Sequence, residues 1–370
     1  MKISKLLQRI FKEFFQLIFK IFYGKINGVY DLKEKGIILK NIKNLEIENK
    51  NIEVNYSIYE ILKGRVYTDT NEHVAFIKDN KIIPNISYQQ IKGNLKEIKF
   101  NKVFKSGTPR MIKNITGRTL SLIQGNSGNN YFHFLFDIVP KLLLLEKKRE
   151  LNNIDYFYIP GKHKWQKKIM SVFGISDKSL MNSQKYRHIK STSLLAMDHP
   201  WYNKGFVNSE FNHIPDWIIY AIREKFLKYS KKFDISERVF IDRSDSYYSH
   251  CKLINNIETI EFLKTKGFNS YKLSELDFFE QIYLFNNSKI IIGPHGAGFA
   301  NIVFSKKDSK IIEIAPKNHS EEYYRKLSKI LNLKYEKIYT EHFEANNKVA
   351  GDIKLNILNL EKILKSYDIS

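Results

Sequence analysis

The segment Gly-Pro-His-Gly-Ala-Gly, residues 293–298, carries the clearest chemical pattern in the chain. The apolar residues before it predict a strand, and the apolar residues after it predict a helix that begins at the glycines. A helix N-terminus offers free N–H groups and a positive dipole end to an anion. The glycines allow a ligand to approach the backbone closely. We therefore expect a diphosphate to bind at His295, Gly296, Ala297 and Gly298.

Two charged residues end or interrupt neighbouring strand-like runs. Arg243 follows RVFID, and its planar guanidinium can clamp a diphosphate. Glu313 lies within KIIEIAP, where a carboxylate can accept hydrogen bonds from both ribose hydroxyls of a nucleotide. A surface salt bridge is the alternative for Arg243, and a solvent-facing carboxylate is the alternative for Glu313.

The glycine-rich turn lacks the features of two common nucleotide-binding motifs. It does not match Gly-x-Gly-x-x-Gly followed by an acidic residue, nor the phosphate loop that ends in Gly-Lys-Ser/Thr. Dinucleotide dehydrogenases and P-loop enzymes are therefore disfavoured.

Strand-like and helix-like segments alternate regularly after residue 236, which predicts a Rossmann-like parallel sheet covered by helices. Short β-prone runs occupy residues 37–105, and a polar stretch from His199 to Asp216 suggests a connection between two lobes. The predicted fold class is α/β with two lobes and a β-rich N-terminal region. We divide the chain into an N-terminal helix (1–25), an N-terminal lobe (26–231), a C-terminal Rossmann-like lobe (232–350) and a C-terminal helix (351–370).

Residues 3–23 place apolar side chains at helical spacing, with lysine and arginine between them. Charges interrupt every window long enough to span a bilayer, and no signal-peptide cleavage pattern follows. The segment predicts a basic amphipathic helix. It can lie on an anionic membrane surface, or pack against this protein or a partner.

The composition favours an anionic partner without specifying it. There are 61 lysines and arginines against 39 acidic residues, which gives a formal net charge of +22. The basic residues are spread along the chain and form no known nucleic-acid motif, so nucleic-acid binding is disfavoured. The single cysteine, Cys251, excludes an internal disulfide framework and fits a reducing cytoplasm.

Several of these segments together resemble glycosyltransferase family 61. The resemblance rests on HGAGFANIVF, on the preceding EQIYLFNNSKIIIGP and RVFIDR, and on GNNYFHFLFDIVPKL about 160 residues upstream. It covers roughly residues 120 to 316. It implies a two-lobed fold of the glycosyltransferase B type, a nucleotide-sugar donor in the C-terminal lobe, and inversion at the anomeric carbon. The family includes bacterial capsular-polysaccharide enzymes, plant xylan glycosyltransferases and animal O-linked N-acetylglucosaminyltransferases.

The resemblance also marks further donor-side residues. Lys252 stands where the family commonly has an arginine, and Asn255-Asn256 stands where it commonly has Asn-Glu. Phe299-Ala300-Asn301 replaces Leu-Thr-Asn after the histidine-glycine segment. Gln281 can reach the donor or brace the turn, and an exposed helix position is the alternative. Tyr247, Tyr248 and His250 are candidates to line the sugar site. Donor binding is thus expected to involve Lys252, Gln281 and Asn301 as well.

Inverting transfer needs a base that removes the proton from the acceptor hydroxyl. His133 and Asp137 follow the turn Gly125–Gly128 and lie four residues apart, so they can share one helix face. Either can be the base while the other orients it. A structural role for both, as a cap and as a partner of nearby backbone, is the alternative.

The sequence contains no Asp-x-Asp motif, so no metal or other cofactor is expected and a nucleotide sugar is the co-substrate. We predict an inverting transferase that uses a uridine diphosphate sugar and a glycan or lipid-linked acceptor, in capsular or cell-surface polysaccharide biosynthesis. Its expected location is the cytoplasm, with peripheral contact to the inner face of the membrane. An inactive scaffold relative and a basic nucleic-acid-binding protein are the alternatives.

Overall fold

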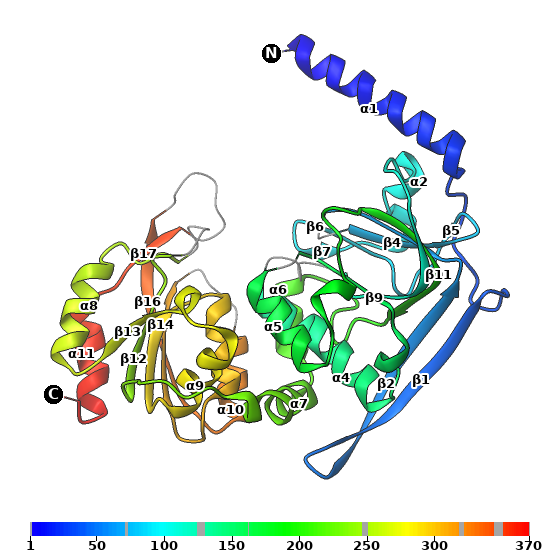
Figure 1. Ribbon diagram of the computed structural model, residues 1–370. Coiled ribbons are helices and arrows are strands. Elements are labelled where there is room, and N and C mark those ends of the chain that lie inside the picture. Colours follow the sequence, from blue (N-terminus) through cyan, green and yellow to red (C-terminus); the bar gives the residue numbers. More distant parts are fainter. Residues whose placement is uncertain are drawn as a thin grey trace. The chain divides into compact units, whose positions relative to one another are not determined.

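The computed structural model describes residues 2–70, 73–123, 130–161, 163–245, 251–317, 322–343 and 351–369. Contacts divide the chain into two compact units, Met1–Ile214 and Pro215–Ser370 (Figure 1). The predicted turn Gly125–Gly128 and the candidates Tyr247, Tyr248 and His250 lie outside the described residues.

The first unit begins with the predicted N-terminal helix, α1 (Lys2–Tyr23). The β-rich region that the sequence predicts follows, as a series of mostly antiparallel strands. Polar and apolar residues alternate along the long second strand, which has one buried face and one exposed face. These strands are β1 (Ile37–Ile47), β2 (Lys50–Leu62), β3 (Arg65–Thr70), β4 (His73–Lys78), β5 (Lys81–Ile82), β6 (Tyr88–Ile91) and β7 (Asn94–Leu95).

Four further strands add a parallel section to the same sheet, in the order β10-β9-β8-β11. The chain passes from β8 to β9 through a continuous helical segment whose apolar side chains are buried. The strands are β8 (Lys113–Ser121), β9 (Tyr156–Ile159), β10 (Leu180–Asn182) and β11 (His188–Met197). The helical elements are α2 (Val103–Ser106), α3 (Tyr131–His133), the π-helical turn η3 (Phe134–Ile138), α4 (Val139–Lys147), α5 (Lys164–Val172) and α6 (Val207–Glu210).

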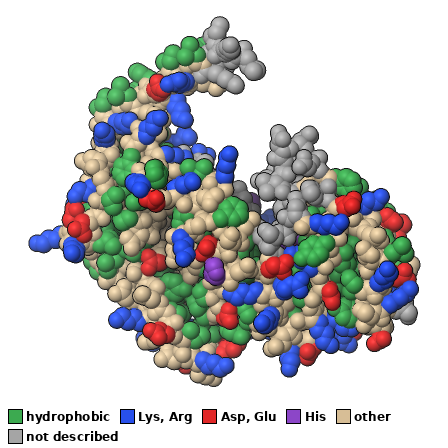
Figure 2. Space-filling model, turned by 180° about the vertical axis from the view of Figure 1, so that it is seen from behind, with side chains coloured by type: hydrophobic (Ala, Val, Ile, Leu, Met, Phe, Trp, Pro, Cys, Tyr) green, Lys and Arg blue, Asp and Glu red, His purple; other side chains and the backbone are tan. Residues whose placement is uncertain are grey.

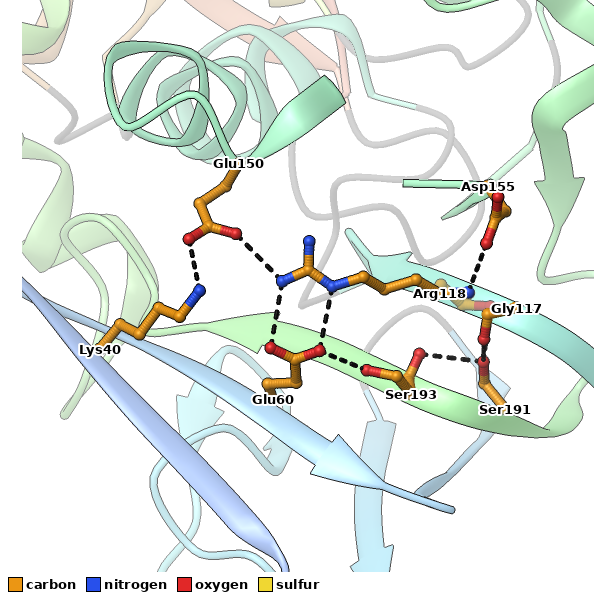
Figure 3. Close-up of polar contacts among 9 residues, drawn as sticks. Lys40, Glu60, Gly117, Arg118, Glu150, Asp155, Ser191 and Ser193 are labelled. Atoms are coloured by element: carbon orange, nitrogen blue, oxygen red, sulfur yellow. Dashed lines mark hydrogen bonds and ion pairs between the residues drawn. The ribbon is translucent and has the colours of Figure 1, made fainter. Parts of the chain in front are cut away.

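An ion-pair network joins strands that are far apart in the sequence (Figure 3). Arg118 in β8 makes two bonds to Glu60 in β2, at 3.0 and 3.1 Å, and one of 3.0 Å to Glu150 after α4. Lys40 in β1 bonds Glu150 at 2.6 Å, and Ser193 in β11 donates to Glu60 at 2.7 Å. Burial alone would raise the pKa of Glu60, but the hydrogen bonds from Arg118 and Ser193 lower it overall. The network fixes β2, β8 and the end of α4 together.

The second unit contains a six-stranded sheet in the order β13-β12-β14-β15-β16-β17. The first five strands are parallel and the last is antiparallel. Numbered along the chain, the parallel strands follow the doubly wound order 2-1-3-4-5. They are β12 (Arg238–Asp242), β13 (Asn269–Lys272), β14 (Ile290–Pro294), β15 (Lys310–Pro316), β16 (Lys334–Phe343) and β17 (Asp352–Lys354).

Helices cover both faces of this sheet (Figure 1). Side chains of α8 (Asn256–Thr265) and α11 (Ile357–Ser366) pack with Phe240, Ile292 and Ile312 in one core cluster. The other face carries the 3-10 helix η9 (Ala297–Phe304), whose Phe299 lies against Gly293. This helix contacts α7 (Asp216–Phe226), α9 (Phe278–Asn287) and α10 (Tyr323–Ile330).

The structure confirms the α/β class, with one mixed and one largely parallel sheet. Short 3-10 turns complete the chain at Ile98–Phe100, Leu151–Asn153, Asp177–Ser179, Phe211–His213, Leu227–Tyr229 and Leu273–Glu275. Within the described part of the chain, no helix is both long and apolar enough to cross a membrane.

We expect Arg118→Met to lower the free energy of unfolding by about 2 to 3 kcal/mol, because it leaves two half-buried carboxylates without their arginine. Equilibrium urea unfolding measures the change. Lys167→Met is the matched control, since Lys167 pairs with Asp177 on the surface and such pairs contribute little. Equal effects of the two substitutions would contradict a structural role for the network.

Candidate functional site

The strand order of the second unit creates a point where two chain connections diverge. From β12 the chain continues through α8 to β13, and from β14 it continues through η9 to β15 on the other side. Ligands of open α/β sheets bind in the crevice at such a point, beyond the carboxyl ends of the strands. Arg243 follows β12 and His295 follows β14, so both lie at this edge. Arg243 and His295, which the sequence predicts to bind the donor, therefore lie close together in the structure.

Arg243 lies directly against the glycine-rich turn. Its Nη1 donates to the backbone carbonyl of His295. A Cβ added at Gly296 would stand 2.0 Å from that Nη1, which is far inside contact distance. Glycine at 296 is therefore required for the guanidinium to lie in this place. The guanidinium of Arg243 thus places a positive charge in direct contact with the glycine-rich turn.

A buried hydrogen-bond chain holds the ring of His295. Its Nδ1 bonds Glu313 Oε1, and the hydroxyl of Tyr335 donates to Glu313 Oε2. Burial alone would raise the pKa of Glu313, but the interactions with His295 and Tyr335 lower it. The sequence suggested that Glu313 contacts a ribose. Because the side chain is buried and both of its oxygens are engaged, we assign Glu313 to positioning His295 instead.

Two tyrosines that the sequence did not indicate contact the turn or the side chains that hold it. Tyr324 in α10 donates to the carbonyl of Gly296 at 2.8 Å, and its ring packs against those of His295 and Phe299. Tyr335 in β16 contacts Glu313, as described above. Neither stands in a motif, and only the neighbouring positions of β14, β15 and β16 bring them to the histidine.

Gln281 and Asn301 join the helix that follows the turn to the segment before α9. Gln281 in α9 accepts a hydrogen bond of 2.9 Å from Asn301 in η9 and donates to the carbonyls of Leu273 and Leu276. Asn301 is fully buried, so its side chain does not face a ligand. Gln281 is buried, and its amide joins η9 to the segment that precedes α9. Gly298 adds to the close packing, since a Cβ there would lie 2.7 Å from Leu273.

The loop after β12 is held by Asp242. Its carboxylate accepts bonds from Ser244 and, at 3.0 Å, from Asn256 at the start of α8. Asn256, a departure from the family pattern, therefore has a structural partner. Lys252 is exposed, and its backbone carbonyl accepts a bond from Ile353. Ala297 is the first residue of η9, which is a 3-10 helix where the sequence suggested an ordinary helix.

In the first unit, His133 and Asp137 contact each other as their spacing predicts. His133 Nδ1 lies 2.9 Å from Asp137 Oδ2, and both side chains are buried. Asn130 caps the start of α3 by accepting bonds from the N–H groups of Phe132 and His133. The pair spans a π-helical turn, an irregularity that is frequent at functional sites. Because Nδ1 is engaged, proton exchange with a ligand has to use Nε2 of His133.

A second histidine reaches the same carboxylate. His199 Nε2 lies 3.6 Å from Asp137 Oδ2. His199 comes just after β11, which pairs in parallel with β8, so both segments leave the same edge of the sheet. The stretch from His199 to Asp216, which the sequence suggested as a connection between lobes, contains the boundary of the two units at Ile214 and Pro215. His199 itself belongs to the first unit, and its ring contacts Trp201 and Tyr202.

Trp201 fixes the other oxygen of the carboxylate. Its Nε1 lies 3.1 Å from Asp137 Oδ1 and 3.1 Å from the carbonyl of Phe136. Nothing in the spacing of Trp201 along the sequence indicates this contact.

Basic side chains surround the buried carboxylate of Asp137 and affect its pKa. Burial alone would raise the pKa of Asp137, but His133 and His199 lower it to about 2, so the group is a carboxylate at neutral pH. Lys141, one turn further along, is also buried, and burial lowers its pKa to about 8. Asp137 is thus suited to orient His133 and poorly placed to accept a proton itself. Among the described residues, no cluster of histidine, cysteine and acidic side chains could hold a metal ion.

Residues 131–312, just under half of the chain, match the family model described as Glycosyltransferase 61. Over these residues the chain is similar to the glycosyltransferase 61 family. The match begins at α3 and ends in β15, so it contains His133, Asp137, Arg243 and His295. Tyr324 and Tyr335 lie beyond it.

A short segment of the chain is also similar to one named transferase. The chain is 36% identical over 63 residues to an EGF domain-specific O-linked N-acetylglucosamine transferase of Gallus gallus. The matched segment is 17% of this chain and spans only 12% of the length of that relative.

The buried Lys141 makes the free energy of unfolding depend on pH in a measurable way. Between about pH 8 and 10.5 the lysine is neutral in the fold and protonated in the unfolded chain, so unfolding takes up a proton. Stability from this group therefore rises with pH across that window, by up to about 3 kcal/mol. We expect Lys141→Met to remove this rise. Chemical denaturation of both proteins at several pH values measures the difference.

Lys148→Met is the matched control, because Lys148 is an exposed lysine at the end of the same helix. Its stability relative to the unsubstituted protein should not change across the window. A constant difference between the Lys141→Met variant and the unsubstituted protein would contradict the prediction.

Proposed function

We propose that this protein is a glycosyltransferase that moves a sugar from a nucleotide diphosphate to a hydroxyl acceptor. The observation that carries the proposal is the contact of Arg243 with the His295 carbonyl at the point where the strand order diverges. The family assignment supports it, since the match contains both residues. We further propose that the two units form a two-lobed enzyme of the glycosyltransferase B type.

On the donor side, the proposal assigns Arg243 and His295 to the diphosphate. A guanidinium and backbone N–H groups can neutralise the charge that develops on the departing diphosphate, without a metal ion. Glu313 supports this by holding the His295 ring in one orientation. We propose a uridine diphosphate sugar as donor. The name of the relative specifies N-acetylglucosamine, so UDP-N-acetylglucosamine is the first donor to test.

On the acceptor side, we assign His133 as the general base. Its Nε2 takes the proton of the acceptor hydroxyl while the hydroxyl oxygen bonds to the anomeric carbon. The bond from that carbon to the diphosphate breaks in the same step, so the configuration inverts. Asp137 holds the ring through Nδ1 and stabilises the imidazolium that forms. His199 and Trp201 keep the carboxylate in place.

The proposed acceptor is a glycan or a lipid-linked saccharide, in capsular or other cell-surface polysaccharide synthesis. α1 supports this part of the proposal, because it is amphipathic and basic and its apolar side chains are exposed. We propose that it holds the enzyme at the inner face of the cytoplasmic membrane.

Donor binding tests the diphosphate site. UDP-N-acetylglucosamine and UDP should raise the melting temperature with and without a chelator. Arg243→Gln and Gly296→Ala should weaken UDP binding by about 10- to 100-fold, because the first removes the charge and the second displaces it. Calorimetric titration measures the change. Arg238→Gln at the opposite end of β12 is the matched control and should bind normally. Absence of any nucleotide response would contradict the proposal and favour an inactive relative.

His133→Gln and Asp137→Asn test the base. Both should reduce the turnover number by about 10²- to 10⁴-fold while UDP binding stays unchanged, because they act on the acceptor side. Transfer to a saccharide acceptor is measured by release of UDP. The control is His213→Gln, an exposed histidine of the same unit. Full turnover in the folded His133→Gln variant would exclude His133 as the base.

A further inference from the structure

The helix α1 carries an exposed apolar surface. Nine of its large hydrophobic side chains are exposed, and Ile21 and Phe22 each keep 75% of their surface accessible. In Figure 1 the helix projects from the rest of the first unit, and Figure 2 shows apolar and basic side chains together along it. Exposed apolar surface of this extent marks an interaction site. The nine are Leu6, Leu7, Ile10, Phe11, Phe14, Phe15, Leu17, Ile21 and Phe22.

The C-terminal end of α1 is fixed to the body of the unit. Lys20 donates to the carbonyl of Lys105 at 2.7 Å, and the hydroxyl of Tyr23 accepts a bond of 3.2 Å from the N–H of Ile112. The ring of Tyr23 also packs edge-on against His188. These contacts set the position of the helix relative to the segment 102–111.

A groove of about 760 Å³ lies between α1 and that segment. One wall presents Phe11, Phe15 and Phe19 of the helix, and the lining includes four basic residues and no acidic one among the described residues. A second hollow of about 550 Å³ shares part of this lining and adds further lysines. The basic residues of the groove are Lys12, Lys102, Arg110 and Arg187, and those added by the second hollow are Lys113 and Lys185.

We propose that this groove binds the phosphate of an anionic membrane lipid, while the exposed apolar face of α1 enters the acyl region. The inference rests on the proposed function, because it supplies the contact that holds the enzyme beside a lipid-linked acceptor. Basic side chains next to an inserted amphipathic helix are attracted to the negative surface of the cytoplasmic leaflet. The basic side chains of the groove, considered without the apolar face of α1, could also bind the phosphates of a nucleic acid. The aliphatic side chains Leu6, Ile10 and Ile21 favour a membrane, since they offer nothing to a phosphate backbone.

Co-sedimentation with vesicles tests the groove, using the full chain. The protein should bind vesicles of phosphatidylcholine with 30% phosphatidylglycerol and bind pure phosphatidylcholine weakly. Lys12→Gln combined with Arg110→Gln should weaken binding to the anionic vesicles by about tenfold or more, since each basic residue at the surface contributes substantially. Lys43→Gln combined with Lys50→Gln is the matched control. It removes the same charge from the β1–β2 hairpin, whose turn lies away from α1 (Figure 1), and should change binding less than about twofold.

Three other results of these experiments would overturn the inference. Equal losses in the two double variants would mean that net charge alone binds the membrane. Binding of inorganic phosphate that the groove variant abolishes, with vesicle binding unchanged, would identify a soluble phosphate site. Loss of binding to single-stranded RNA with vesicle binding unchanged would identify a nucleic-acid surface. UDP binding of the groove variant, measured in parallel, should be normal, so failure of the groove is distinguishable from failure of the donor site.

Discussion

In each unit, a buried carboxylate holds a candidate site histidine in place through a hydrogen bond. Asp137 holds His133 and Glu313 holds His295, in each case through Nδ1 of the ring. A buried carboxylate costs several kcal/mol unless other groups compensate its charge and fill its lone pairs. His199 and Trp201 do this for Asp137, and Tyr335 does it for Glu313. These surrounding side chains therefore keep the two imidazole rings in fixed orientations.

Parallel strands supply the framework for both arrangements. In the first unit, β8 and β11 end at one edge, which brings His199 to Asp137. In the second, β12 and β14 end together, which brings Arg243 to His295. Residues that are 62 or 52 positions apart thus meet because neighbouring parallel strands have the same direction. Each site depends on sheet register more than on local sequence.

A glycine makes the contact between Arg243 and the turn possible. Gly296 leaves the space that the guanidinium of Arg243 occupies. A larger residue at 296 would move the charge away from the turn, so the glycine is a requirement of the site and not only of the backbone.

The sequence by itself determined the α/β class, the N-terminal helix, the glycine-rich turn after a strand, and the pairing of His133 with Asp137. These follow from local patterns, namely the alternation of strand and helix signals and the four-residue spacing on one helix face. The sequence did not determine the contacts of His199, Trp201, Tyr324 and Tyr335, or the bracing role of Glu313 and Asn301. Only the tertiary structure decided these, because each depends on which strands are neighbours and on burial, and neither is encoded in the spacing of residues along the chain.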